Sequence, residues 1–364
     1  MKYNVLFVGS FVDKSKSGHV GGQMFASRTL INSSLKNEVN WILLDTTATK
    51  NIDYVIIYRA VKAVIRLLKF VNILFFKKVD KILIFSSHGF SIIEKGIMVL
   101  LGKLFGKIVI LAPRSGAMIT DVRDSGFMKW WVSLIISMAN IVICQSEFWK
   151  NFYSGLLKNN DNNKLVVIQN WIDINEYKIV KRKNNTENIN VLFLSWVTKE
   201  KGIFELIEAA NYLKNDYPGV KYVIGGKGED FELAKQKVSD YSMDEKFIFK
   251  GWVLGSDKKQ LFADSDIYVL PTYFEGFPNS LVEGMVSGLP CIAGNVSSIP
   301  DLIEDGNNGL LVEPGNVPDL KLKLKKLYDD PDLRVRLSYN ARKSIVDNNT
   351  IEIAVKKFKN LLLD

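Results

Sequence analysis

The stretch that decides the fold reads DIYVLPTYFEGFPNSLVEGMVSGLPCIA and covers residues 266–293. Its two ends are apolar runs of strand length. Between them, Pro278 suits the first turn of a helix, and Gly288 suits the left-handed residue that follows a last helical turn. The pattern therefore predicts a helix over 278–287 between two strands, which is a βαβ unit with parallel strands.

The same alternation of short apolar runs and helical patterns extends over the whole chain. Near-continuous apolar strands separated by helices are typical of parallel sheets that helices cover on both faces. The expected fold class is therefore α/β, with two doubly wound, Rossmann-like domains that face a central cleft. Strands are expected at 4–8, 41–44, 81–85, 108–112, 141–144, 165–168, 190–195, 220–225, 246–250, 266–270 and 290–293, and further helices at 23–31, 92–105 and 203–213.

Composition excludes several classes of protein. The chain has 364 residues, 47% of them hydrophobic and 24% charged, which suits two globular domains. Both cysteines lie in apolar runs, and two histidines cannot form a three-histidine zinc site. No uncharged apolar run reaches the roughly 20 residues of a membrane span. The first residues run straight into a strand, without the pattern of a secretory signal, so a cytoplasmic location is expected.

Charge is distributed unevenly along the chain. Residues 1–170 carry 22 Lys and Arg against 10 Asp and Glu, so this half is expected to face an anionic partner. Residues 59–78, RAVKAVIRLLKFVNILFFKK, form a helix-like basic run, and residues 127–138 add Trp130 and Trp131. These segments fit an interfacial helix on anionic lipid, but they also fit ordinary domain helices with a solvated basic stripe. We find no nucleic-acid recognition module, and no nucleic acid is expected as a partner.

Two acids and the start of a helix form the candidate site. Glu275 lies in the loop after the strand, and Glu283 lies about one and a half turns inside the following helix. Gly276 allows a ligand to approach the backbone closely, and the N-terminus of a helix favours phosphate. A sugar nucleotide matches this arrangement, with one carboxylate on the ribose, the other on the sugar, and the diphosphate between them. The competing interpretation is an acid near a helix N-terminus together with a solvated helix face.

The surrounding sequence resembles the donor-binding segment of glycosyltransferase family 4, retaining enzymes of the GT-B fold. The resemblance is specific over EGFPNSLVEGMVSGLPCIAGNVSSIPDLIEDGNNGLLVEPGN, residues 275–316. Further elements are similar and come in the family's order: VGG at 20–22, QNWID at 169–173, VLFLS at 191–195, KEKGI at 199–203 and IGGKG at 224–228. The resemblance implies an acceptor-binding domain over 1–170, a donor-binding domain over 171–345, and a C-terminal helix in 346–364 that packs back on the first domain.

The resemblance also implies a role for each part of the site. Glu275 would bind the transferred sugar, Glu283 would bind the ribose, and Lys201 would neutralise the departing diphosphate. Without a metal, that departure requires fixed positive charge and oriented amides. The further donor-binding residues would be Gly276, Phe277, Pro278, Asn279, Ser280, Gly225, Lys227 and Trp196, and the residues on the acceptor side would be Gly21, Gly22 and Arg114.

Two departures from the family pattern concern cations. The family usually has an arginine five residues before Lys201, where this chain has Trp196. Arg114, in the PRSG run at 113–116, or Lys227 could replace the missing charge. The Arg114 loop also lacks the histidine that many family members have. These departures motivate an alternative, a non-catalytic GT-B protein that binds a sugar nucleotide or a partner enzyme.

The function implied by the resemblance is the transfer, with retention, of a sugar from a nucleotide-sugar donor to a saccharide or lipid-linked saccharide acceptor. The context would be the biosynthesis of a surface polysaccharide: a capsule, an O-antigen or an exopolysaccharide. A UDP-sugar is the favoured donor. No metal and no cofactor are expected. Because the leaving phosphate would itself accept the acceptor's proton, no dedicated protein nucleophile is required. The protein would lie on the inner face of the cytoplasmic membrane as a peripheral protein, through its basic first domain.

Overall fold

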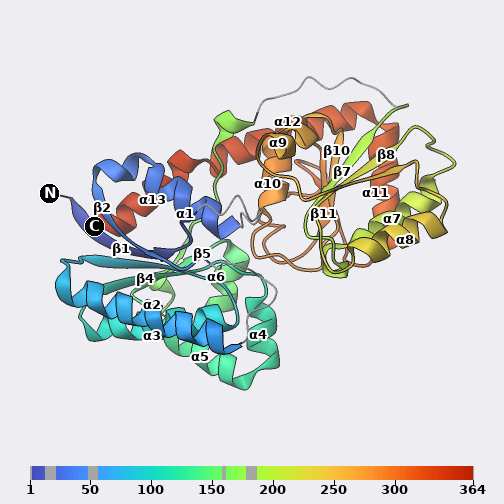
Figure 1. The fold of residues 1–364 in the computed structure, drawn as a ribbon. Helices are drawn as coiled ribbons and strands as arrows, with labels where there is room; N and C mark the ends of the chain where they lie inside the picture. Colours follow the sequence, from blue (N-terminus) through green and yellow to red (C-terminus); the bar gives the residue numbers. More distant parts are fainter. Residues whose placement is uncertain (1, 13–21, 48–55, 158–160, 178–186, 364) are drawn as a thin grey trace. The chain divides into compact units, whose positions relative to one another are not determined.

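A computed structural model of the chain describes residues 2–12, 22–47, 56–157, 161–177 and 187–363. The chain forms two compact units, the first made of Met1–Trp171 and Ile351–Asp364, the second of Ile172–Thr350 (Figure 1). Each unit has its own six-stranded sheet.

The first and last residues of the second unit lie next to each other in space. Ile172 bridges to Thr350, and the Ile172 N–H donates to the carbonyl oxygen of Asn349 at 2.9 Å. The boundaries expected from the sequence, after residues 170 and 345, differ from those of the compact units by one and by five residues.

The sheet of the first unit contains parallel strands β1 (Tyr3–Gly9), β2 (Val39–Asp45), β3 (Lys81–Ser86), β4 (Ile108–Pro113), β5 (Ile141–Cys144) and β6 (Leu165–Val167). Their order is β2-β1-β3-β4-β5-β6, and every neighbouring pair is parallel. The central strand β3, KILIFS, is buried at every position. Such a continuous buried run is expected of a strand that helices cover on both faces.

Helices cover both faces of this sheet (Figure 1). One apolar core unites the sheet with α2 (Ile56–Phe76), α3 (Phe90–Leu104), α4 (Met118–Asp124), α5 (Gly126–Met138) and α6 (Glu147–Ser154). A separate core unites it with α1 (Gly22–Asn32) and α13 (Ile351–Leu363). In this second core the rings of Trp171 and Phe358 lie 5.4 Å apart. The C-terminal helix α13 is therefore part of the first unit. Two short 3₁₀ helices, η2 (Ser34–Asn37) and η3 (Asn162–Lys164), complete the unit.

The sheet of the second unit contains parallel strands β7 (Asn190–Leu194), β8 (Lys221–Gly225), β9 (Phe247–Gly251), β10 (Ile267–Leu270), β11 (Cys291–Gly294) and β12 (Leu310–Val312). Their order is β12-β11-β10-β7-β8-β9. The helices are α7 (Ile203–Leu213), α8 (Phe231–Asp240), α9 (Gly255–Ala263), α10 (Asn279–Val286), α11 (Val317–Asp329) and α12 (Pro331–Asn348), with 3₁₀ helices η4 (Ile174–Glu176) and η5 (Lys199–Lys201).

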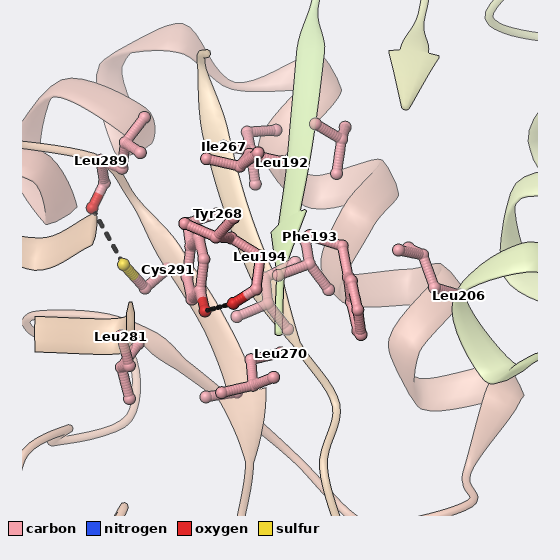
Figure 2. Packing of buried hydrophobic residues seen from close by; sticks show 14 of the residues in the cluster. Leu192, Phe193, Leu194, Leu206, Ile267, Tyr268, Leu270, Leu281, Leu289 and Cys291 are labelled. Atoms are coloured by element: carbon pink, nitrogen blue, oxygen red, sulfur yellow. Dashed lines mark hydrogen bonds between the residues drawn. The ribbon is translucent and has the colours of Figure 1, made fainter. Parts of the chain in front are cut away.

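One apolar core holds this second unit together. Figure 2 shows Tyr268 of β10 at its centre, between Leu192 and Leu194 of β7 and Cys291 of β11. All four side chains are at least 90% buried. Packing of this density makes the two central strands a rigid platform for the loops that follow them.

The expected fold class is confirmed, because both sheets are parallel, doubly wound and flanked by helices. Each of the strands expected from the sequence is present, with ends shifted by two residues at most. The short strand β12 was not predicted. The helix expected over 278–287 begins at Asn279 and ends at Val286. Pro278, with ψ at 89°, is the residue before the helix, so its placement in the first turn was wrong.

Candidate functional site

The candidate site lies where the chain changes direction across the second sheet. From β7 the chain continues to β8 and β9 on one side, and it then builds β10, β11 and β12 on the other. In open α/β sheets, ligands bind at the carboxyl ends of the strands beside such a point. The two loops concerned are residues 195–202, after β7, and residues 271–278, after β10.

Backbone contacts join these two loops. The carbonyl oxygen of Glu200 accepts hydrogen bonds from Tyr273 N at 2.9 Å and from Thr272 Oγ1 at 3.0 Å. Gly202 has a φ of +77°, and a Cβ at this position would lie 2.1 Å from the carbonyl oxygen of Pro271. Only glycine permits both the left-handed conformation and this close approach. Gly202 therefore determines how near Lys201 comes to the second loop.

Lys201 and Glu275 form an ion pair across the two loops. The Lys201 Nζ lies 2.7 Å from Glu275 Oε1 and 3.5 Å from the Phe274 carbonyl oxygen. The two side chains are 17% and 13% exposed. Oε2 of Glu275 has no hydrogen-bond partner among the residues that the structure describes. The sequence predicted that both residues contact the donor. In the structure they lie together and contact each other.

Glu283, on α10, is held by a second lysine and a tyrosine. Its Oε1 accepts hydrogen bonds from Lys258 Nζ at 2.5 Å and from the Tyr177 hydroxyl at 3.0 Å. Burial, and then the nearby Glu283 carboxylate, raise the pKa of Tyr177, so its hydroxyl remains a donor. The Glu283 side chain is 12% exposed, and its Oε2 has no partner within the described part of the chain. Each of the two acids therefore keeps one carboxylate oxygen for a ligand.

The start of α10 lies between these two acids in the sequence. The Tyr268 hydroxyl donates to Ser280 Oγ at 2.7 Å. The same hydroxyl lies 3.3 Å from the carbonyl oxygen of Leu194 (Figure 2). Phe277 is only 6% exposed, and its side chain packs in the core of the second unit. Helix α10 begins at Asn279, and the positive end of its helix dipole lies there.

The glycine turn after β8 lies against the loop after β7. A Cβ on Gly225 would lie 2.4 Å from Leu194 Cδ1, and a Cβ on Gly226 would lie 1.8 Å from the Ser195 carbonyl oxygen. Gly225 is thus required for packing between the strands. Lys227 is exposed, and its Nζ lies 5.8 Å from the centre of the Phe231 ring. The turn supports the loop that carries Lys201.

Trp196 occupies the place where the family pattern has arginine. Its side chain is 47% exposed, and its ring meets that of Trp252 edge to face at 4.7 Å. The indole offers an aromatic surface beside the loop, and it supplies no charge. Trp196 thus cannot replace the charge of the arginine, and the cation of this loop that contacts Glu275 is Lys201.

Arg114, from the acceptor-side group, follows β4 in the first unit. Its Nη2 donates to Asn170 Oδ1, and its guanidinium lies over the rings of Phe85 at 4.6 Å and Trp171 at 5.2 Å. Burial lowers the pKa of Arg114 to about 9. Its Nη1, like Ser86 Oγ at the end of β3, is buried without a hydrogen-bond partner among the described residues.

A half-buried guanidinium that lacks a carboxylate partner among the described residues is costly to keep charged, and an incoming anion would reduce that cost. Arg114 therefore stays a candidate for an anionic group of a ligand. Gly22 is the exposed first residue of α1, and Gly21 lies outside the described residues.

Sequence reasoning missed Lys258 and Tyr177. They lie 25 and 106 positions from Glu283, so no local spacing connects them with it. One signal was available for Lys258: it lies in the first turn of α9, and helices that follow parallel strands begin at the carboxyl edge of the sheet. Tyr177 had no comparable signal.

Comparisons with known proteins show which proteins the chain is similar to. Residues 173–344 match the model of the family "Glycosyl transferases group 1". Over 218 residues the chain is 29% identical to the UDP-Gal:alpha-D-GlcNAc-diphosphoundecaprenol alpha-1,3-galactosyltransferase of Escherichia coli, covering 56% of this chain and 55% of that protein. Over 204 residues it is 27% identical to the capsular polysaccharide biosynthesis glycosyltransferase CapM of Staphylococcus aureus, covering 55% and 50%. The chain thus spans about half the length of these curated relatives.

Solved structures resemble the whole chain. The sucrose-phosphate synthase of Thermosynechococcus elongatus aligns with a TM-score of 0.80 at 16% identity, over 99% of this chain and 98% of that one. HepE of Anabaena, in complex with UDP, aligns with a TM-score of 0.74 at 17% identity over 100% of both chains. At these identities the likeness shows the fold. Residues 173–344 therefore resemble the glycosyl transferases group 1 family, in a chain with the two-domain GT-B fold.

Proposed function

We propose that this protein is a retaining, metal-independent glycosyltransferase that moves a sugar from a nucleotide-sugar donor, with UDP favoured as the nucleotide, to a lipid-linked saccharide. The reaction would serve the biosynthesis of a surface polysaccharide. One observation carries the proposal: at the switch point of the second sheet, Lys201, Glu275 and the start of α10 converge from two strand-end loops.

The Lys201–Glu275 ion pair gives this convergence a chemical use. A donor diphosphate would take Lys201 as its counter-ion, and the released Glu275 carboxylate would accept hydrogen bonds from the hydroxyls of the sugar. Because the pair is only partly exposed, its charges interact more strongly than in bulk water. The dipole of α10 would stabilise the charge that develops on the leaving phosphate.

Glu283 would bind the ribose through Oε2. Tyr177 and Lys258 both contact Oε1, so they fix the orientation of the carboxylate and leave its other oxygen for a ligand. A positioned acceptor discriminates strongly against ligands that lack the matching hydroxyl, because the buried oxygen would then stay unpaired. Trp196 offers a surface on which a base could stack.

The names of the relatives support the choice of donor and acceptor. The Escherichia coli relative is named for UDP-Gal as donor and for a diphosphoundecaprenol-linked acceptor, and CapM for capsular polysaccharide biosynthesis. We infer the same classes of substrate for this chain. Retention would follow if the acceptor's hydroxyl attacks the anomeric carbon from the same face that the phosphate leaves. The departing phosphate would accept the proton of that hydroxyl. This route assigns no nucleophile to the protein.

The test is a transfer assay with the purified full chain. UDP-sugars are supplied with a lipid-linked saccharide acceptor, and UDP release and product are followed with and without a chelator. We expect an acceptor-dependent, chelator-resistant product whose NMR coupling at the anomeric carbon shows retention. Inversion, or loss of activity that Mn²⁺ or Mg²⁺ restores, would contradict the mechanism. Absence of transfer with every nucleotide sugar would contradict the activity.

The second candidate is a non-catalytic protein that binds a sugar nucleotide or a partner enzyme, and Trp196 in the place of arginine is the observation that favours it. The first candidate and the sugar-nucleotide-binding form of the second both predict that UDP raises the melting temperature, because a ligand of the folded state stabilises it. They differ in turnover. Tight binding without hydrolysis or transfer would establish the second candidate and exclude the first.

We also propose that the protein works at the inner face of the cytoplasmic membrane, where a lipid-linked acceptor and a nucleotide sugar are both available. The basic balance of residues 1–170 supports an anionic surface as the partner. No helix within the described ranges is long and apolar enough to cross a bilayer.

A further inference from the structure

Helix α2 has two apolar faces, whereas a helix on a globular domain needs only one. Its inner face packs into the core through Phe70, which is fully buried, and Leu74, which is 6% exposed. Its outer face consists of Val61, Val64, Ile65, Leu68, Phe75 and Phe76, which are 51%, 54%, 40%, 66%, 67% and 81% exposed. We call these six residues the outer face of α2.

The spacing of the outer face places its members on one side of the helix, with the exposed Asn72 between Leu68 and Phe75. Val61, Val64, Ile65 and Leu68 are separated by three, four and seven positions, which places them on one side of a helix, and Phe75 follows seven positions later. Scattered exposed apolar residues are normal on a protein surface, but a contiguous stripe marks an interaction site. The outer face therefore requires an occupant.

Exposed aromatic residues continue this surface onto the neighbouring helix. The Arg66–Glu94 ion pair, with N–O distances of 2.6 and 2.8 Å, ties α2 to α3. At the start of α3, Phe90 is 59% exposed, and the Arg59 guanidinium lies 5.5 Å from the centre of its ring. Beyond the end of α3, Phe105 meets Phe75 edge to face at 4.9 Å. The outer face thus contacts the residue after α3 through Phe75, and Arg59 beside it contacts the first residue of α3.

The charges beside the outer face are of one sign. Helix α2 contains no acidic residue, and Arg59, Lys62 and Lys69 follow one flank of the stripe at helical spacing. Arg66 is neutralised by Glu94, a residue of α3 that is 6% exposed. The remaining cations have no acidic partner among the described residues. The partner must therefore bind apolar side chains and cations at the same time. A partner with an apolar interior and an anionic surface does both.

We propose that the outer face of α2 inserts into the interfacial region of an anionic phospholipid bilayer. Amphipathic helices with cations beside an apolar stripe lie in the plane of such a surface, and each nearby cation strengthens binding to anionic lipid. A second copy of this chain fits less well, because a symmetric contact through α2 would bring like charges together. The inference rests on the proposed function only in that a lipid-linked acceptor gives membrane docking its purpose.

Co-sedimentation of the full chain with lipid vesicles tests the proposal. The vesicles contain phosphatidylcholine alone or an equal mixture of phosphatidylcholine and phosphatidylglycerol. We expect binding to the mixture, weakened by salt, and little binding to phosphatidylcholine. The triple variant V64S/L68S/F75S should bind at least tenfold more weakly, because burial of apolar side chains drives insertion. Replacing Lys62 and Lys69 by glutamine should weaken binding by about fivefold per charge.

The matched control removes equally exposed apolar side chains from the second unit. Leu233, Leu322 and Val335 are 57%, 61% and 54% exposed, and the variant L233S/L322S/V335S should bind vesicles as the unchanged protein does. Thermal unfolding confirms that all variants are folded. Equal binding by both triple variants, or no vesicle binding by the unchanged protein, would overturn the proposal. So would a dimer in light scattering that V64S/L68S/F75S dissociates in the absence of vesicle binding.

Turnover with a water-soluble acceptor separates this inference from the proposed function. Without vesicles, V64S/L68S/F75S should transfer sugar as fast as the unchanged protein. Vesicle binding without any turnover would contradict the proposed function and leave the docking surface intact. Turnover without vesicle binding would contradict the docking surface alone.

Discussion

Replacing Glu283 by glutamine should weaken the binding of UDP by about 10- to 150-fold and leave the protein nearly as stable. Glu283 Oε1 is held by Lys258 and Tyr177, so the ligand must use Oε2. In the variant, the amide nitrogen replaces an acceptor with a donor. A hydrogen bond to a charged group contributes about 1.5–3 kcal/mol, which sets the expected loss of affinity. Isothermal titration calorimetry measures it directly.

The stability of this variant distinguishes ligand binding from a structural role. Lys258 loses its carboxylate, but its side chain is 28% exposed and water screens the charge, so the free energy of unfolding should fall by less than about 1 kcal/mol. The Tyr177 hydroxyl can donate to the amide oxygen instead. The control is Glu232→Gln, since that carboxylate is 83% exposed and pairs, among the described residues, only with Lys235 on the same helix. An unchanged affinity for UDP, together with a large loss of stability, would refute the reasoning.

Three further predictions concern the neighbouring residues. Lys201→Met should lower kcat/KM by about 10²–10³-fold, and it should lower the free energy of unfolding by about 1–3 kcal/mol because Glu275 loses its cation. Adding Glu275→Gln should restore the stability and leave kcat/KM low, so recovery of both would contradict the catalytic role of Lys201. Gly226→Ala should unfold at a markedly lower temperature than Gly255→Ala, because both glycines have positive φ but only the Cβ at Gly226 would meet a carbonyl oxygen, at 1.8 Å; equal melting temperatures would refute this steric argument. Arg114→Met should abolish thermal stabilisation by inorganic phosphate without lowering the melting temperature in its absence, and a phosphate effect that survives would exclude Arg114 as an anion site.

The positions of most strands could be predicted from the sequence because both sheets are parallel and buried. Runs such as KILIFS in β3 are apolar throughout, which leaves one interpretation for a segment of that length. The three-residue strand β12 carries too little pattern to be distinguished from a loop. The start of α10 was displaced by one residue, since proline suits both the first turn and the residue before it.

The residues of the proposed donor site could be predicted from the sequence only individually. Lys201 and Glu275 were each expected at the donor, but their ion pair depends on the approach of two loops 74 positions apart, made possible by Gly202. The contacts of Lys258 and Tyr177 with Glu283 depend in the same way on tertiary packing. Likewise, the basic character of residues 59–78 was visible in the sequence. The division of α2 into a buried and an exposed apolar face required the structure.

A crystal structure of the protein with a bound UDP-sugar tests the central claim most directly. The account predicts that the diphosphate lies within hydrogen-bond distance of Lys201 Nζ and the start of α10. The ribose should contact Glu283 Oε2, and the 2.7 Å contact between Lys201 and Glu275 should be replaced by contacts with the donor. A nucleotide bound elsewhere, with the Lys201–Glu275 ion pair intact, would contradict it.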